Sequence, residues 1–174
     1  MRAFTLILVL FILGSFVSPE TNPQTSIKDD EDFCTVFFRI IKAGVEQNFD
    51  NIKGKSLGTV RKGNNFIQKW ESIENLPGQS NAQITKSFAT SFTSTILEAD
   101  QITDSMKTIY EKWGFEIKDC LSPSWLIRES AVEGLYKKIS IGRRDPTEML
   151  KFPNIILEIE NLNGKYVLYF KVIK

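Results

Sequence analysis

The sequence contains no histidine, and this absence removes several kinds of chemistry. Serine–histidine and cysteine–histidine nucleophile pairs, histidine-ligated zinc and the usual general base near neutral pH all need an imidazole ring. Catalysis would therefore have to rely on carboxylates, lysine or tyrosine. The chain also carries no catalytic motif, metal-binding cluster or cofactor fingerprint, so we expect neither a metal nor a cofactor.

A glycosylation acceptor and a phosphate-binding loop are lacking as well. No Asn-x-Ser/Thr triplet occurs in the sequence. Gly54-Lys55-Ser56 matches the last three residues of a phosphate-binding loop, but Phe49 stands where the first glycine belongs. The segment also follows a predicted helix rather than a strand, so we interpret it as a flexible basic loop.

Long apolar runs are confined to the N-terminus. Residues 3–17 carry no charge and follow Met1 and Arg2, a pattern typical of a secretory signal peptide, here covering residues 1–18. The run is shorter than the roughly 20 residues that span a bilayer, so a cleaved signal is favoured over a retained anchor. The residues around Ser18 form a poor cleavage site, which leaves the position of the cut open. We expect a secreted or periplasmic protein with no membrane span in the mature chain.

An excess of charge of either sign is also absent. Removing residues 1–18 takes away Arg2 and leaves 21 of the 22 basic side chains against 21 acidic ones. A chain with a net charge near zero has no overall field that would attract it to nucleic acid or to anionic lipid. We therefore expect no nucleic-acid partner.

Cysteine occurs only twice, at Cys34 and Cys120, both after the predicted signal. In an oxidising compartment an isolated pair most simply forms one disulfide. A reactive or redox role would need CxxC spacing or an activating neighbour in the sequence, and neither is there. Two buried free thiols are the alternative.

Two stretches have the periodicity of amphipathic helices, and they follow a polar, flexible leader at residues 19–28. In residues 33–49, apolar side chains recur every four positions directly after a cluster of acids. In residues 99–120, apolar side chains are spaced three and four apart. Residues 29–174 are long enough to form one domain with a sizeable core.

The remaining segments predict strands and turns. Aromatic and β-branched residues between turn signals mark strands at residues 66–73, within 82–96, and at 135–141, 154–160 and 165–173. Residues 53–65 contain three glycines and predict a loop or short hairpin. Asn163-Gly164 predicts a hairpin between the last two strands.

The predicted order of elements is α-β-β-α-β-β-β, which favours an α+β fold. We expect two helices packed on one face of a mainly antiparallel sheet of about five strands. If Cys34 and Cys120 are bridged, the start of the first helix touches the end of the second. The helices should then lie roughly antiparallel.

Basic and aromatic residues supply candidate contacts. Two basic clusters far apart in the sequence would form one anion-binding patch if they converge: Lys53, Lys55, Arg61 and Lys62, and Arg143 and Arg144. An acidic glycan, nucleic acid or acidic protein would then be a candidate partner, and solvated loop charge is the alternative. Trp70 and Trp125 lie beside turn signals and are candidate aromatic contacts, with a place at the edge of the core as the alternative.

Two groups of acids are further candidates. The run from Asp29 to Asp32 lacks the spaced ligands and central glycine of a calcium loop, so we interpret it as favourable charge at a helix start. Glu158 and Glu160 share one face of a strand, and two acids are the minimum for glycoside hydrolysis. Alternating charge on a solvent-facing strand is the simpler explanation for them.

These observations favour an exported, non-enzymatic binding or interaction domain of unknown specificity. A sheet covered by helices on one face has a free face, which can bind a protein partner or a second copy of the chain. One alternative is a carrier of an apolar small molecule or lipid in a cavity between sheet and helices. Another is a carboxylate-based hydrolase, which requires two acids facing a cleft.

Overall fold

The computed structural model describes residues 31–131 and 137–174. The predicted signal peptide and leader therefore lie outside the described residues. The described helices are α1 (Phe33–Gln47), α2 (Asp104–Cys120) and the short α3 (Pro146–Met149), together with a 3₁₀ turn, η1 (Asp50–Ile52). The described strands are β1 (Lys53–Lys62), β2 (Asn65–Ser72), β3 (Gln83–Lys86), β4 (Thr90–Ala99), β5 (Trp125–Ser130), β6 (Lys138–Arg143), β7 (Asn154–Leu162) and β8 (Lys165–Ile173).

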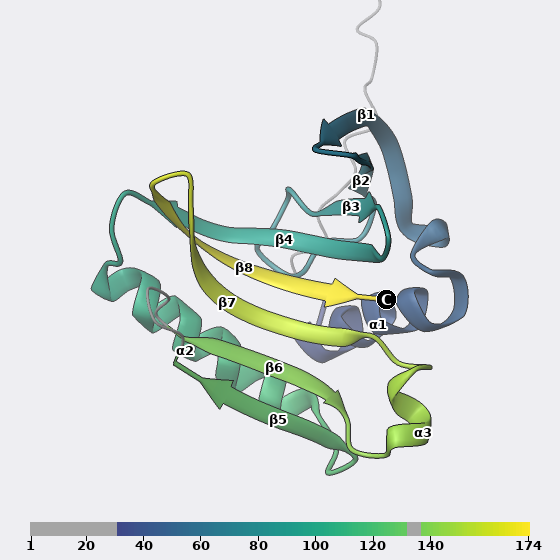
Figure 1. Ribbon diagram of the computed structural model, residues 1–174. Coiled ribbons are helices and arrows are strands. Elements are labelled where there is room, and N and C mark those ends of the chain that lie inside the picture. Colours follow the sequence, from purple (N-terminus) through teal and green to yellow (C-terminus); the bar gives the residue numbers. More distant parts are fainter. Residues whose placement is uncertain (1–30, 132–136) are drawn as a thin grey trace, which may run out of the picture.

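Across the described residues, eight strands form one sheet in the order β1-β2-β3-β4-β8-β7-β6-β5, and every pair of neighbours is antiparallel (Figure 1). The two halves of the chain share one plan: α1 precedes β1 to β4, and α2 precedes β5 to β8. The fourth strands of the two halves, β4 and β8, pair at the centre of the sheet. The sheet is therefore built from two wings that meet at β4 and β8.

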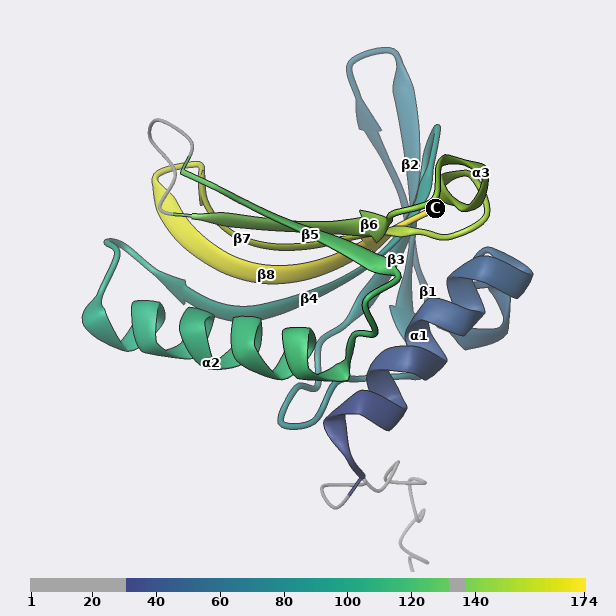
Figure 2. The same ribbon diagram turned by 90° about the horizontal axis from the view of Figure 1, so that it is seen from below.

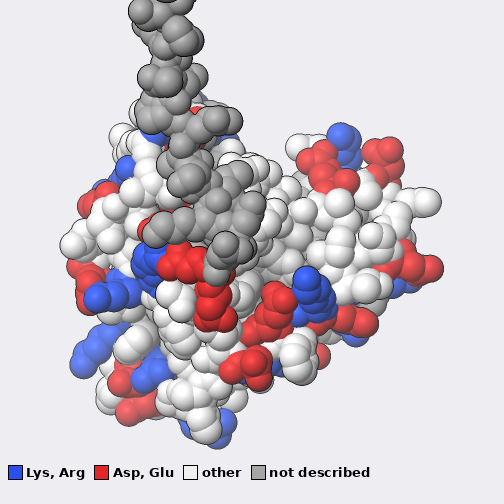
Figure 3. Space-filling view, turned by 180° about the vertical axis from the view of Figure 1, so that it is seen from behind, with Lys and Arg blue, Asp and Glu red and all other residues white. Residues whose placement is uncertain are grey.

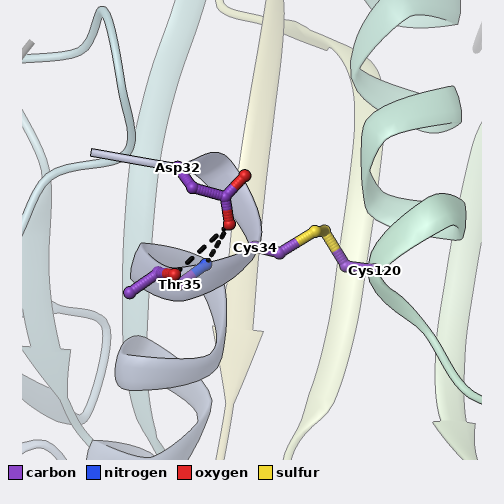
Figure 4. Close-up of a disulfide and its surroundings, with 4 residues drawn as sticks. All are labelled: Asp32, Cys34, Thr35 and Cys120. Carbon is purple, nitrogen blue, oxygen red and sulfur yellow. Dashed lines mark hydrogen bonds between the residues drawn. A yellow bond between two sulfur atoms is a disulfide. The ribbon is translucent and has the colours of Figure 1, made fainter. Parts of the chain in front are cut away.

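Helix α1 begins where the acidic cluster predicts a favourable helix start. The Asp32 carboxylate accepts hydrogen bonds from the backbone N–H and the hydroxyl of Thr35, at 3.1 and 3.3 Å (Figure 4), and so satisfies a free donor of the first turn. The helix ends at Asn48 and Phe49, whose φ angles of 49° and 66° are left-handed. This reversal carries the fully buried Phe49 ring back against Gly44.

The core lies between the two long helices and one face of the sheet. Phe37 of α1 and Trp113 of α2 both contact Phe170 of β8, with ring centroids 6.0 and 6.3 Å apart, respectively. Along β8 every second residue is fully buried on this side: Leu168, Phe170 and Val172. Figure 2 shows α1 and α2 on the same side of the sheet, so that neither covers the opposite face.

The outer surface of the helices carries charge of both signs. Seen from the helix side, acidic and basic side chains are intermixed (Figure 3). Some form ion pairs one turn apart, Lys42 with Glu46 on α1 and Lys112 with Glu116 on α2. Pairs of this kind contribute a few tenths of a kcal/mol to helix stability, about 0.3–0.5 kcal/mol each. None of the helices in the described ranges has the length and apolar character needed to cross a membrane.

A disulfide joins Cys34 in the first turn of α1 to Cys120 at the end of α2, with a Cα–Cα distance of 5.3 Å (Figure 4). The bond fits an extracellular location. The sequence predicts that the bridged helices lie roughly antiparallel, but they meet at the bridged ends and run apart from there (Figure 2). A disulfide fixes the distance between two helix ends and leaves the angle between the axes free. The core beneath the helices determines that angle.

The α+β class and the mainly antiparallel sheet are as the sequence predicts, but the number of strands is wrong: the described residues contain eight rather than about five. Three strands account for the difference. Residues 53–62 form β1, which makes a hairpin with β2 where the sequence predicts a loop or short hairpin. Residues 83–99 form the two strands β3 and β4 where one strand is predicted within 82–96, and β5 at residues 125–130 has no predicted counterpart.

Two of the three missed strands, β1 and β5, share a physical cause. Almost all of β1 is exposed, and the last three residues of β5 are exposed too. Strands with little burial have no reason to alternate apolar and polar side chains, and that alternation is the signal from which a strand is predicted. Their register is set by backbone hydrogen bonds to the neighbouring strand instead.

Candidate functional site

The face of the sheet opposite the helices is the candidate site, and we call it the open face. The central strands curve so that this face lies on the inside of the curve (Figure 2). Because side chains alternate along a strand, the residues between the core residues point to it. In the second half these are Leu126 and Arg128 of β5, Lys138, Ser140 and Gly142 of β6, Asn154, Ile156, Glu158 and Glu160 of β7, and Val167, Tyr169, Lys171 and Ile173 of β8.

The open face is hollowed at the end next to α3, and we call this depression the hollow. Its volume is about 500 Å³, within the range of small-molecule sites. Its apolar lining includes Leu126, Met149, Leu150, Ile156 and Ile173, and its basic lining consists of Arg128, Lys138 and Arg143. A depression with an apolar wall and a few polar groups is the usual form of a ligand site.

Helix α3 forms one wall of the hollow and is held firmly in place. Arg143 pairs with Glu148 at 2.5 Å and donates a hydrogen bond to the Ser124 hydroxyl at 2.9 Å. Asp145 caps the helix by accepting a 2.8 Å bond from the backbone N–H of Thr147, and this bond is the main cause that lowers the pKa of Asp145. The ammonium of Lys174 donates to two backbone carbonyls just after α3. The wall is thus prearranged by the polar contacts of Arg143, Asp145 and Lys174.

A polar network lies beside the hollow, in the next row of the sheet. The Tyr169 hydroxyl is 2.9 Å from a carboxylate oxygen of Glu158 and 2.8 Å from one of Glu160. Lys138 pairs with Glu158 at 3.2 Å, whose side chain is almost completely buried although it is on the open face. Burial, followed by the bonds to Glu160 and Glu158, raises the pKa of Tyr169, so the phenol keeps its proton and remains a donor.

In the second half of the sheet, two cations of the open face have no carboxylate partner among the described residues: Arg128 of β5 and Lys171 of β8. They belong to one cross-strand row, in which Arg128 is opposite Ser140, Ser140 opposite Ile156, and Ile156 opposite Lys171. Arg128 and Lys171 are three strand spacings apart, a distance of about 14 Å between their backbones. Positive charge without a counter-charge therefore flanks Ile156 on both sides.

Two other depressions differ from the hollow in their lining. One of about 540 Å³ lies between α1 and the β5 edge, but its charged residues Lys42 and Glu46 pair with each other and its Arg143 pairs with Glu148. The other, of about 470 Å³, lies beside β1 and is lined largely by polar and glycine residues. Of these three depressions, the hollow on the open face combines an apolar wall with an unpaired cation.

The two basic clusters predicted from the sequence do not converge. Lys53, Lys55, Arg61 and Lys62 lie on β1, at one edge of the sheet, while Arg143 and Arg144 lie at the end of β6, beside the other edge. Several members are also engaged locally. The Lys53 ammonium pairs with Asp50 at 2.5 Å, and the Arg61 Nε–H donates to the Gly63 carbonyl at 3.0 Å.

The two tryptophans predicted as contacts lie in or beside the core. Trp125 is 6% exposed and packs edge-on against Phe152, with Arg143 over its ring at 4.9 Å. Trp70 is partly buried, and the Lys53 ammonium lies 4.1 Å from its ring centroid. Each ring is thus covered on at least one side by a neighbouring cation.

The acids near the start of α1 are engaged in helix capping and ion pairs. Asp32 is the N-cap of α1, and Glu31 pairs with Arg39, which also reaches Glu74 at 3.2 Å. Asp29 and Asp30 lie outside the described residues. In residues 31–131 and 137–174, no group of three or more potential metal ligands comes together.

The residues that line the hollow could not be identified as a set from the sequence. They come from β5, β6, β7, β8 and α3, and they meet only once the strand order and register are known. The available signal was the alternation in β7, where Ile156, Glu158 and Glu160 share a face. No protein-family model, no curated protein sequence and no solved structure matches this chain.

Proposed function

We propose that this chain is an exported, non-enzymatic binding domain whose ligand site is the hollow on the open face. The observation that carries the proposal is the hollow itself, about 500 Å³ in volume, with an apolar wall from α3 and the strands and an unpaired arginine at its border. Export rests on the predicted signal at residues 1–18, and the disulfide fits that destination.

In the described residues, packed side chains fill the space between the sheet and the helices and leave little room for an apolar ligand. Between sheet and helices, the rings of Phe37, Phe92 and Phe170 are fully buried and in contact with their neighbours. Packed rings of this kind favour a solid core there. A small apolar molecule would therefore bind on the open face rather than in the cavity between sheet and helices that the sequence suggests.

The contacts of Glu158 and Glu160 support a structural role rather than hydrolysis. Both carboxylates are hydrogen-bonded to the Tyr169 hydroxyl, and Glu158 also pairs with Lys138. A general acid and a nucleophile would each need to face a substrate. In this network both carboxylates face the Tyr169 hydroxyl instead, and Glu158 also faces the Lys138 ammonium.

The distribution of apolar residues favours a small molecule over a protein partner or a second copy of the chain. The apolar residues at the α3 end gather around the hollow, whereas the neighbouring row is occupied by Lys138, Glu158 and Tyr169. A stable protein interface needs about 800 Å² per partner with an apolar centre. A small ligand needs only the depression.

A neutral fluorescent dye tests the proposal without assuming a charged ligand. We expect N-phenyl-1-naphthylamine to gain fluorescence on binding the full chain purified after export. Ser140→Trp places an indole in the hollow and should abolish the gain. Thr59→Trp adds the same side chain to the exposed surface of β1, remote from the hollow, and should leave it unchanged.

The dye experiment has a clear negative outcome. If the wild-type chain gives no fluorescence gain, or if Ser140→Trp binds the dye as well as Thr59→Trp while both keep the wild-type circular dichroism, the hollow is not a binding site. The mass of the intact exported chain tests the other half of the proposal. A chain that retains residues 1–18 would contradict cleavage of the signal.

A further inference from the structure

All charged residues in the described lining of the hollow are basic, although the chain as a whole is nearly neutral. Three cations and no carboxylate contribute to the lining formed by the described residues. Two of the cations are already neutralised, Lys138 by Glu158 and Arg143 by Glu148. Arg128 has no such partner among the described residues, so its charge is available to a ligand.

Most of the apolar lining of the hollow lies closer to α3 than Arg128 does, and Ile156 shares the row of Arg128. Leu126, Gly142 and Ile173 belong to the row nearest α3, together with the exposed side chain of Leu150 at the rim. Arg128 lies two residues further along β5, and two residues of a strand span about 6.8 Å. A ligand lying along the strands would therefore meet apolar surface at one end and positive charge at the other.

We infer that the ligand is an anionic amphiphile, an apolar chain with a carboxylate or phosphate head group, and that Arg128 binds the head. This inference rests on the proposed function. The guanidinium of Arg128 can donate two parallel hydrogen bonds to a carboxylate or phosphate, which suits it to such a head better than an ammonium group. Ser140, opposite Arg128 on β6, adds a hydroxyl donor to the same place. The tail lies against Leu126, Ile173 and Leu150.

The same geometry disfavours a cationic head group and a neutral one. A cationic head would lie beside Arg128 without a counter-charge in the hollow, which is unfavourable. A neutral head group would leave the Arg128 guanidinium without an ionic partner, so the charge would add little to the binding of the ligand. Lys171, at the far end of the row, adds a second positive charge with no carboxylate partner in the described residues and so reinforces the preference for an anion.

Matched ten-carbon probes test the inference on the full chain purified after export. Displacement of N-phenyl-1-naphthylamine by decanoate, decyl phosphate, decanol and decyltrimethylammonium is measured at low salt. We expect the two anions to bind about tenfold or more tighter than decanol, since a hydrogen bond between charged groups is stronger than one to a neutral hydroxyl. The cation should bind most weakly. The tighter of the two anions identifies the head group.

Three variants locate the effect. Arg128→Gln should weaken decanoate binding by about tenfold and leave decanol unchanged. Arg144→Gln removes an exposed arginine that does not line the hollow and should change neither. Ser140→Asp places a negative charge beside Arg128, and should weaken decanoate and strengthen decyltrimethylammonium. This gain for the cation cannot arise from unfolding.

The outcomes separate this inference from the proposed function. If decanol and decanoate displace the dye equally, or if Arg128→Gln weakens both to the same extent, the assignment of the head group to Arg128 is overturned and the hollow remains a binding site. If the wild-type chain binds neither the dye nor any probe, the proposed function itself is overturned.

Discussion

Cys34 and Cys120 connect the two halves of the chain at a single point on the helix side of the sheet. Their Cα atoms are 5.3 Å apart and 86 residues separate them in sequence. Beside the bond, the Phe33 ring meets the Trp113 ring edge-on at 5.6 Å. Because α1 and α2 run apart from this point, the bridge and its flanking rings hold the two helix ends together.

Removing the disulfide should therefore cost much of the stability of the fold. In the chain-entropy description, a bridge that closes a loop of this length stabilises the folded state by about 4–5 kcal/mol. We expect the double variant Cys34→Ala/Cys120→Ala to lose up to that amount in urea denaturation. Reduction of the wild-type protein should have the same effect. An unchanged denaturation midpoint after reduction would show that core packing alone holds the helix ends.

Tyr169→Phe tests the network on the open face. The substitution removes the hydroxyl that lies between the carboxylates of Glu158 and Glu160 and leaves Glu158, which is almost completely buried, with its Lys138 ion pair alone. We expect a loss of about 1–2 kcal/mol in the free energy of unfolding near neutral pH. Adding Glu160→Gln to this variant should recover part of the loss, because it removes one of the two negative charges.

The same residue predicts how stability responds to alkaline pH. The pKa of Tyr169 is raised from its ordinary value of 10.0, mainly by burial, so above that value the unfolded chain releases a proton that the folded chain keeps. The folded state then becomes less stable as pH rises. Wild type should lose stability above pH 10.0 more steeply than Tyr169→Phe. Parallel pH profiles for the two proteins would contradict the assignment.

Much of the fold follows from local signals in the sequence. The four-residue period that begins at Phe33 and the acid at Asp32 place the start of α1, and the turn at Asn163-Gly164 places the β7–β8 hairpin. The bounds of β8, Lys165 to Ile173, are those that the alternation predicts. These signals involve residues close in sequence, and so they need no knowledge of the tertiary structure.

The open face and its hollow could not be predicted, because they depend on which distant strands pair. The pairing of β4 with β8 joins the two halves, and nothing in either strand specifies the other. The common plan of the halves is also hidden, since no repeat of residues accompanies it. Arg143 and Arg144 show the same limit of prediction from sequence. They are adjacent and of the same type, yet their surroundings in the fold differ.

This difference between the two arginines is itself testable. Arg143 pairs with Glu148 and lies over the rings of Trp125 and Phe152, at 4.9 and 4.3 Å, whereas the side chain of Arg144 is exposed. We expect Arg143→Ala to lose about 2 kcal/mol or more in unfolding free energy and to weaken dye binding, because α3 forms a wall of the hollow. Arg144→Ala should stay within about 0.5 kcal/mol of wild type. Equal effects would argue against the anchored wall.

Gly44 and Gly114 offer a matched pair of helix positions with different expectations. Alanine normally gains about 1 kcal/mol over glycine inside a helix. At Gly44, however, a Cβ would lie 2.7 Å from the Phe49 ring, and that ring is fully buried and has no room to retreat. Overpacking of this kind costs about 1–3 kcal/mol, so Gly44→Ala should be destabilising.

At Gly114 the nearest atom to an added Cβ is the terminal methyl of Ile139, at 2.9 Å. A methyl at the end of a flexible side chain can rotate away, whereas a ring enclosed by the core cannot. The helix-propensity gain should therefore offset the contact, and Gly114→Ala should fall within about 1 kcal/mol of wild type in urea denaturation. If Gly44→Ala proved as stable as Gly114→Ala, the left-handed reversal at Phe49 would not hold its ring against α1.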